Sequence, residues 1–587
     1  MSTCAGAWWA GPIPLSIGVG VMVGALALSR PSLLVVAAFV LAAGLGHRSL
    51  AGLDPPPRSP FTGVVTLVSD PRVQRWGASV DVSVDGDRVE LVAAGAAAGA
   101  VTSARAGERL AVRGRVGPPP DDAPWLIPRH VRARLSADSV ELHDRGAAPW
   151  RAANRLRGLV ERGARPMGEP IRFLFGGFVL GDRSSIPPAV EDDFQAAGLT
   201  HLMVVSGANV AFVLTLASPL TTRLRLFPGW AVTVGIIGAF ALLTRFEPSV
   251  LRASAMAAVA VTTHASGRQA RSVRVLALAV SGLVLVDPLL VRSVGFQLSV
   301  MATAGIVVGG GPLARLLPGP ASLRQAVAVT IAAQLAVAPL LVSRFGGVPV
   351  VAPVANVIAA PAAGAATIWG LPAGVAAGVM GEPWERWLHL PTALAVRWVA
   401  GTARIAALAP LGELSTWHLV LVVLAGGAAL VGRQRRWPPR ARAPLWGVVV
   451  LTLLAPAVAL RHAPFEVRPT SGVVLYRSGG ATVVVVRAGT DPGQAMAGLR
   501  RVGVRRIDLV VDDGAGPDVV EALDHRWPLG RIIAPENLDA PLTMTVGELL
   551  VHLDSNSTTV LGPESVGRQP VRAPEREGFG ATDRVGG

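Results

Sequence analysis

Long apolar runs separated by short polar stretches dominate the chain and indicate its fold class. A helix needs roughly 17–25 apolar residues to cross a bilayer, and several runs between residues 200 and 460 reach that length. We therefore expect a polytopic α-helical membrane protein with about 12 transmembrane helices. The runs lie near 12–29, 32–46, 203–220, 229–244, 250–264, 273–287, 294–310, 325–343, 349–382, 391–409, 415–431 and 443–460.

Segments outside these runs show other patterns. In one, apolar and polar residues alternate between Gly and Pro clusters, which predicts an OB-like β-barrel. In another, strand-like stretches alternate with helical ones, which predicts a small α/β domain. The expected domains are N-terminal helices at 1–50, the OB-like domain at 60–146, a transmembrane domain at 165–460, the α/β domain at 464–560 and a disordered tail at 561–587.

Arginine alone carries the basic charge, because the chain contains no lysine. Arginines are dense in the short loops 266–274 and 432–442, and the positive-inside rule predicts that these loops are cytoplasmic. Both soluble domains are then extracytoplasmic, provided that residues 349–382 cross the membrane an odd number of times. Four prolines in that segment favour a broken or re-entrant helix. A path that tracks phosphate groups is the alternative explanation for the arginines.

Composition excludes several kinds of site. A single cysteine, Cys4, rules out an intramolecular disulfide and any cysteine-based zinc or iron–sulfur centre. Without lysine, the phosphate loop of a P-loop ATPase cannot form, so any transport would take its energy from a partner or a gradient. We expect no cofactor and no enzymatic activity.

The most informative polar residues, Asp182, Arg183 and Ser184, lie directly before an apolar run. A short acidic helix is expected to follow them, because prolines suit its first turn and Gly198 suits its end. Polar groups cost free energy inside a bilayer, so by default they mark working sites. We therefore expect these three residues to belong to a transport path.

The apolar run that follows carries three more polar side chains. A helix capped by Thr200 is expected to take His201, Ser206 and Asn209 into the membrane. Ser206 and Asn209 would share a face, with His201 one turn further out. For each residue, the alternative is a hydrogen bond to a neighbouring helix.

Polar residues recur at two later places in apolar surroundings. Glu247 lies between Arg245 and Arg252, which predicts either a part of the same path or a structural set of ion pairs. Gln297 lies within a predicted helix, where an interhelical hydrogen bond is the alternative to a substrate contact.

Six short motifs, in this order, resemble those of the ComEC family of competence DNA-uptake proteins. They are Gly181–Ser184, Gly198–Gly207, Pro248–Ala253, Asp287-Pro288 with Gly295–Ser299, Gln334–Leu340, and Asn356–Pro361. The resemblance implies a channel for single-stranded DNA. Two departures stand out: Asn209 occurs where many members have a second histidine, and the C-terminal domain lacks an HxHxDH metal motif. We therefore expect a degenerate, metal-free form of the family's metallo-β-lactamase-like domain.

The expected function is that of an inner-membrane channel component that imports single-stranded DNA across the cytoplasmic membrane during natural transformation. Its expected partners are single-stranded DNA, the lipid bilayer, a DNA receptor, and separate ATPase or motor proteins of a competence system. A second copy of this chain, in a homo-oligomer, is a further candidate partner. One alternative is a transporter of another solute, or an envelope protein of the same family without DNA uptake. Another is a membrane-anchored nuclease whose metal is bound by Asp512, Asp513 and Asp518.

Overall fold

The computed structural model shows a chain that folds as two compact units. The described residues are 1–28, 30–74, 76–120, 123–205, 207–265, 271–409, 411–460, 465–538, 540–554 and 557–562. The first unit comprises Met1–Ile186, Leu199–Arg344 and Pro353–Thr402, and the second comprises Pro187–Gly198, Phe345–Ala352 and Ala403–Gly587. Most of the expected tail, from 563 onward, lies outside the described residues.

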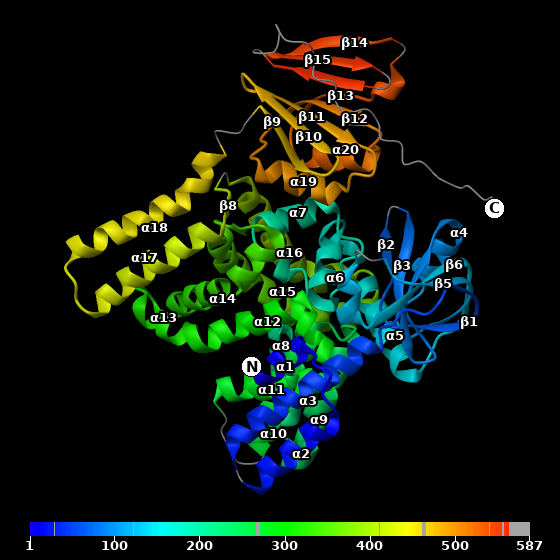
Figure 1. Ribbon diagram of the computed structural model, residues 1–587, viewed down its shortest axis with the longest axis vertical. Helices are drawn as coiled ribbons and strands as arrows, with labels where there is room; N and C mark the ends of the chain where they lie inside the picture. The colour runs from blue at the N-terminus through cyan, green and yellow to red at the C-terminus, as the bar shows by residue number, and fades with distance from the viewer. Residues whose placement is uncertain are drawn as a thin grey trace. The chain divides into compact units, whose positions relative to one another are not determined.

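A six-stranded sheet forms the β part of the first unit (Figure 1). Its strands are β1 (Ser59–Leu67), β2 (Arg72–Gln74), β3 (Gly77–Val84), β4 (Asp87–Ala93), β5 (Arg109–Gly117) and β6 (Val131–Asp144). They lie in the order β1-β5-β6-β4-β3-β2, and only β4 and β6 run parallel. β1 also pairs with β3 through Thr66 and Leu67. The strand order β1-β5-β6-β4-β3 therefore closes on β1.

Alternating apolar residues produce this sheet, because every second side chain of a strand points to the same face. The buried core includes Val65, Leu67, Val80, Val82, Leu91, Leu110, Val112 and Leu135. Helix α4 (Gly95–Ser103) adds Ala97 and Val101. At Gly114, a Cβ atom would lie 2.1 Å from the Ser136 carbonyl oxygen, so only glycine lets β5 and β6 approach so closely there.

The remaining elements of the first unit are mainly helical. They are α1 (Ser2–Trp9), α2 (Leu15–Ala27), α3 (Pro31–Ala51), α5 (Ala148–Gly163), η2 (Arg165–Met167), α6 (Ile171–Leu180), η3 (Thr200–Leu202), α8 (Gly207–Thr221), α9 (Leu226–Leu243), α10 (Pro248–Ala265), α11 (Ser272–Val286), η4 (Pro288–Arg292), α12 (Val294–Gly305), η5 (Ile306–Gly310) and α13 (Gly311–Leu316). Three more lie mostly within the same unit: α14 (Ala321–Phe345), α15 (Ala352–Met380) and α16 (Trp384–Leu408).

Among the described residues, six helices are long and apolar enough to cross a membrane by length and composition. They are Ser32–Ala51, Val294–Leu316, Ala321–Phe345, Ala352–Met380, Thr416–Gln434 and Pro439–Ala459. This is the make-up of a multi-pass membrane protein, but the expected number of about 12 spans is not confirmed. The other apolar runs also form helices, mostly shorter ones. The 15 residues of α8, for example, extend only about 22 Å, less than the ~30 Å hydrocarbon core of a bilayer.

The broken or re-entrant helix expected within 349–382 is not observed. α15 is one continuous helix of 29 residues that contains Pro361 and Pro372. Pro353 lies in its first turn, where the backbone nitrogen needs no partner. Pro349 lies outside it, in the two-residue strand β7 (Val348–Pro349).

The second unit holds the C-terminal α/β domain, the helices α7 (Pro188–Ala196), α17 (Thr416–Gln434) and α18 (Pro439–Ala459), and the short strand β8 (Glu413–Leu414). The C-terminal elements are β9 (Glu466–Thr470), β10 (Val473–Ser478), β11 (Ala481–Arg487), α19 (Pro492–Arg501), β12 (Ile507–Asp513), α20 (Pro517–Arg526), β13 (Leu529–Ile533), η6 (Pro535–Asn537), β14 (Leu542–Val546), β15 (Leu549–Asp554) and β16 (Ser557–Leu561).

The central sheet of this domain has the strand order β13-β12-β11-β10-β9, and its two faces are covered differently (Figure 1). Helices α19 and α20 pack on one face around Leu475, Val510 and Leu523. The three-stranded sheet β14-β15-β16 packs on the other around Leu509 and Val551.

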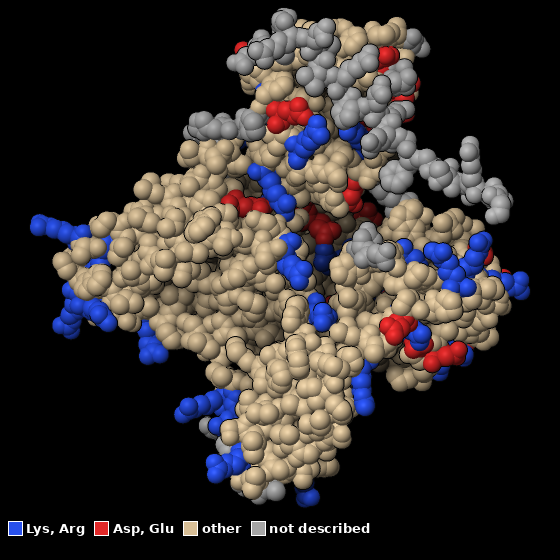
Figure 2. Space-filling model, in the orientation of Figure 1, with Lys and Arg blue, Asp and Glu red and all other residues tan. Residues whose placement is uncertain are grey.

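Charge is concentrated at the tip of the hairpin formed by α17 and α18. Arg433, Arg435, Arg436 and Arg440 are exposed there. Figure 2 shows arginines at this tip and largely uncharged surface along the sides of the hairpin. This distribution is typical of a membrane hairpin whose loop contacts headgroups and water.

Candidate functional site

The first polar motif forms a loop at the end of α6. This helix ends at Leu180, and Gly181 follows with φ 77°, the left-handed conformation that glycine adopts without strain. Asp182 then accepts hydrogen bonds from the backbone nitrogen of Ser184 (3.0 Å) and from its hydroxyl (2.7 Å). The aspartate thus fixes the loop, and the neighbouring side chain of Arg183 is exposed.

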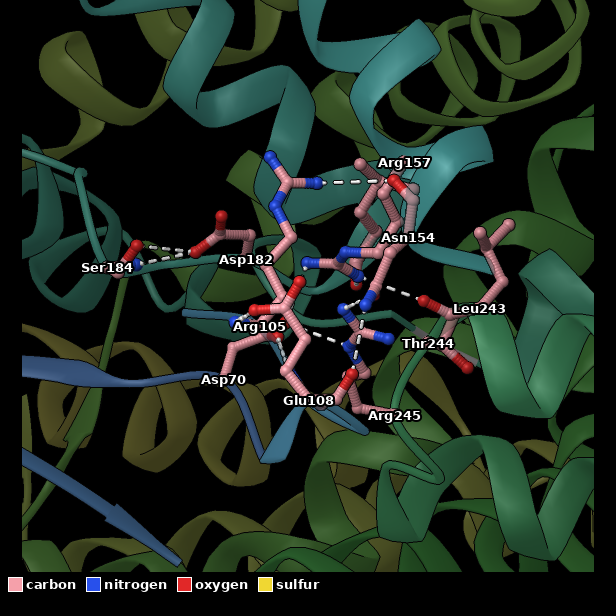
Figure 3. A network of polar contacts seen from close by, with 12 residues as sticks. Asp70, Arg105, Glu108, Asn154, Arg157, Asp182, Ser184, Leu243, Thr244 and Arg245 are labelled. Carbon is pink, nitrogen blue, oxygen red and sulfur yellow. Dashed lines mark hydrogen bonds and ion pairs between the residues drawn. The ribbon is translucent and has the colours of Figure 1, made fainter. Parts of the chain in front are cut away.

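Asp70, in the turn after β1, is the centre of a polar network that joins the sheet to the helices of the first unit (Figure 3). Its Oδ2 accepts a hydrogen bond from Arg245 Nε (2.9 Å) and lies 3.2 Å from Arg157 Nη2. Its Oδ1 accepts one from the backbone nitrogen of Ala106 (3.0 Å). One carboxylate therefore balances two guanidinium groups.

Arg157 of α5 is almost fully buried, with 3% of its surface exposed. Besides facing Asp70, its Nη1 donates to the carbonyl oxygens of Leu180 (3.0 Å) and Leu243 (2.9 Å). These are the last residues of α6 and α9, whose terminal carbonyls lack helical partners. Arg157 therefore holds together the two helix ends from which two loops begin: the Asp182 loop (residues 181–187) and the Glu247 loop (residues 244–247).

Burial and nearby arginines together shift the pKa values of two carboxyl groups, Asp70 and Glu247, in opposite directions. Burial would raise the pKa of Asp70, but the charges of Arg157 and Arg245 and its hydrogen bonds lower it below the ordinary value. For Glu247, burial outweighs the charges of Arg72 and Arg183 and raises the pKa. Arg183 and Glu247 therefore act on each other electrostatically across the two loops.

The charge partners expected for Glu247 were wrong. Arg245 turns to Asp70 and to Asn154 Oδ1 (2.6 Å), and Arg252 donates from Nε to Ser299 Oγ (2.6 Å). Arg245 has a φ of 60°, in the left-handed region that residues other than glycine rarely adopt.

The single helix expected to carry His201, Ser206 and Asn209 is also not observed. His201 is exposed in the short turn η3, and α8 begins only at Gly207. The chain is not helical at Val205, whose carbonyl oxygen accepts a hydrogen bond from Ser249 Oγ (2.5 Å). Ser206 lies outside the described residues.

Three other predicted residues make contacts between elements. Asn209 is buried, and its Nδ2 donates to the Phe178 carbonyl of α6 (2.8 Å). Gln297 donates to the Val291 carbonyl (2.7 Å). Arg252 lies so close to α8 that a Cβ at Gly207 would be 2.7 Å from its Nη2. These contacts are those of packing, which was the alternative for Asn209 and Gln297.

The acidic helix α7 belongs to the second unit, where it is part of the C-terminal domain. Ala189 packs against the core formed by α19 and α20. Asp192 is 2% exposed and lies between Arg500 (3.3 Å) and Arg526 (3.5 Å). Asp193 forms an ion pair with Arg526. Both acids thus bind arginines of α19 and α20, whose side chains are 12% and 7% exposed.

The aspartates considered for a nuclease site have other surroundings. Asp512 accepts hydrogen bonds from the backbone nitrogens of Ala515 (2.7 Å) and Gly516 (3.2 Å), so it fixes the turn after β12. Over the described residues, the structure contains no group of three or more His, Cys, Asp and Glu side chains placed to hold a metal ion.

Arg105 also joins the network centred on Asp70, because its Nη1 donates to the Asn154 carbonyl oxygen (3.3 Å). Four members of this network were not predicted: Asp70, Arg105, Asn154 and Arg157. Asp70 and Arg105 lie in the segment expected to be a separate barrel, and the other two lie in α5, which has no motif. The one available signal was α5 itself, an amphipathic helix with an arginine on its buried face.

Comparison with known proteins gives the class of this site. Residues 178–438 match the competence protein family. The chain is 26% identical over 184 residues to ComE operon protein 3 of Bacillus subtilis and 29% identical over 192 residues to competence protein ComA of Neisseria gonorrhoeae. It is 27% identical over 198 residues to the uncharacterized protein YcaI of Escherichia coli. No solved structure matches the chain significantly.

The three alignments cover 32%, 31% and 31% of this chain and 26%, 23% and 27% of YcaI, ComE operon protein 3 and ComA, respectively. The aligned segment thus spans about a quarter of each relative. The match over residues 178–438 confirms the resemblance to the competence protein family seen in the motifs. Arg252 and the loops that contain Asp182 and Glu247 all lie inside this matched segment.

We predict that Arg157→Met destabilises the protein by roughly 3–5 kcal/mol, because it removes one of the two guanidinium partners of Asp70 and leaves two helix-end carbonyls without their buried donor. Thermal unfolding of the purified chain in detergent measures this. Because the pKa of Asp70 is lowered, its pairing stabilises the fold at neutral pH and is lost as pH falls through that value. The difference between wild type and variant should therefore shrink below about pH 4.

The control is Arg155→Met, at an exposed position of the same helix, where a change within about 0.5 kcal/mol is expected. Equal stability of the two variants would contradict the role given to Arg157.

We predict that Arg526→Gln loosens α7, since it leaves Asp192 and Asp193 with only part of their counter-charge. Amide hydrogen exchange of residues 188–196, measured on the full chain, should increase by at least about tenfold. Arg531→Gln, at an exposed position of the same domain, should leave it unchanged. Unaltered exchange in Arg526→Gln would show that the ion pairs do not hold α7.

Proposed function

We propose that this chain is the membrane channel component of a competence system, importing single-stranded DNA across the cytoplasmic membrane. Its family and the names of two relatives support a role in DNA uptake. One structural observation carries the finer proposal: Arg183 is exposed at the loop after α6, inside the matched region. An exposed guanidinium in that position can bind phosphate groups of a passing strand.

The surroundings of that loop support its use as a path. Asp182 and Ser184 fix the loop, Glu247 lies within electrostatic reach of Arg183, and His201 is exposed on the segment that follows α7. We propose Arg183 and His201 as contacts for DNA and Asp182, Ser184 and Glu247 as residues that position them. Arg252, Asn209 and Gln297 are proposed as packing residues, and Ser206 remains a proposed path residue from its place in the motif.

The soluble parts fit the same proposal. The closed strand order of the sheet at 59–144, with β4 parallel to β6 and a helix between β4 and β5, supports an OB-type barrel. We propose that this domain meets the incoming strand. The C-terminal domain is proposed to be a degenerate metallo-β-lactamase-like domain without a nuclease centre, so energy and strand processing come from partner proteins.

We predict that Arg183→Gln and His201→Gln reduce the internalisation of labelled DNA with no change in membrane abundance. Hydrogen bonds to charged groups contribute about 1.5–3 kcal/mol, so a lost phosphate contact corresponds to roughly a ten- to hundredfold reduction. The matched control is Arg223→Gln, at an exposed position after α8, which should import normally. Uptake and membrane level are scored together in a strain deleted for this chain.

The outcomes separate the candidate functions. If both variants import DNA normally at normal membrane abundance, the loop with Arg183 and the segment with His201 do not contact the DNA. Unchanged DNA uptake in the deletion strain itself would overturn the channel proposal. It would favour a transporter of another solute or an envelope protein of the same family.

We predict that both soluble domains are extracytoplasmic, on the basis of the arginine-rich loops 266–274 and 432–442. Alkaline phosphatase fused after Gly146 or after Pro464 should be active in both cases, because the enzyme folds only outside the cytoplasm. A cytoplasmic reporter at the same junctions should be inactive. Activity of the phosphatase at one junction only would contradict this orientation.

A further inference from the structure

A charged pocket lies in the first unit, where α5 and η2 meet the end of α15 and the start of α16. Its volume is about 550 Å³, which is within the range of small-molecule sites. Its lining includes Arg162, Arg165, Gly378, Glu382, Glu385 and Arg386. None of these residues belongs to the polar network around Asp70.

Glycines create the wall of this pocket by letting two helices touch. A Cβ at Gly378 would lie 2.1 Å from the Leu159 carbonyl oxygen, and a Cβ at Gly163 would lie 2.5 Å from that of Gly374. A larger residue at either place would separate α5 from α15. The close approach brings Arg162 and Arg165 of one segment next to the acids that follow α15.

The charged side chains of the pocket do not form ion pairs with one another. Within the described part of the chain, none of its three arginines and two glutamates has an ion-pair partner within 4.0 Å. The pocket therefore offers several guanidinium donors and a net positive charge, together with two carboxylates that can accept hydrogen bonds.

The pocket lies beside exposed apolar side chains. Val379 and Met380, the last residues of α15, are 69% and 51% exposed, and Trp384 and Trp387 are 53% and 70% exposed. α15 is one of the helices that can cross a membrane. Tryptophan and arginine together at the end of such a helix are typical of the level of the lipid headgroups.

We propose that this pocket binds the headgroup of an anionic phospholipid that carries hydroxyl groups. Arg162, Arg165 and Arg386 donate to the phosphate, and Glu382 and Glu385 accept from the hydroxyls. The acyl chains lie along the exposed apolar residues at the end of α15. A nucleic acid strand fits less well, because the two carboxylates of the pocket repel a continuous polyanion.

The test uses the full chain in detergent, with phosphatidylglycerol retention counted by native mass spectrometry and the zwitterionic phosphatidylcholine, which has no net charge, as the comparison. Arg165→Gln with Arg386→Gln should weaken retention of phosphatidylglycerol by at least about tenfold, given ~1 kcal/mol for each arginine near a lipid surface. Arg505→Gln with Arg531→Gln, at exposed positions of the C-terminal α/β domain, should change it by less than about threefold.

Two further variants keep the proposal falsifiable if that pair folds poorly. Glu382→Gln should strengthen retention of the lipid by removing a repelling charge, and Arg386→Lys should retain most of it. Equal retention by every variant would overturn the proposal. Displacement of the lipid by inorganic phosphate alone would also overturn it, because this result indicates a free-phosphate site. Loss of oligonucleotide binding in the arginine variants, with lipid retention intact, would overturn it in favour of a nucleic-acid site.

Discussion

A guanidinium group can be buried only when its charge and its donors are satisfied, and Arg157 satisfies both in three directions. It faces Asp70 of the sheet and donates to the terminal carbonyls of α6 and α9. Those helix ends carry partial negative charge, which favours a cation there. The two polar loops of the competence domain start at these ends, so the geometry of the site depends on one arginine outside the matched region.

The same arrangement explains why charge can be gathered beside so much apolar surface. Each arginine of the network has a specific partner: Asp70 for Arg157 and Arg245, and Ser299 for Arg252. Short helices and glycines make these approaches feasible. Arg183 is exposed and lies on a loop whose shape is set by its neighbours Asp182 and Ser184. A rigid loop with an exposed cation is suited to binding an anion repeatedly and weakly.

Patterns along the chain predicted its elements better than its contacts. Alternation of valines located β3, and the apolar runs located the helices, because both signals depend on local periodicity. The partners of Glu247 were missed, because periodicity does not report the positive φ of Arg245. The break in the helix between His201 and Asn209 was missed as well, because periodicity does not report the hydrogen bond from Ser249 to the Val205 carbonyl. The continuity of α15 through Pro361 likewise depends on its packing rather than on local propensity.

The discontinuity of the second unit has a consequence for how such a chain can change over evolution. Helix α7 is inserted between parts of the first unit, yet its Ala189 and Asp192 complete the C-terminal fold. A lineage could therefore change exposed residues of the C-terminal domain at little structural penalty. It could not lose the domain itself without uncovering the buried Asp192 and the apolar Ala189 of α7, a helix that lies inside the matched residues 178–438. Retention of the C-terminal domain then follows from the threading of the chain, whatever chemistry the domain has.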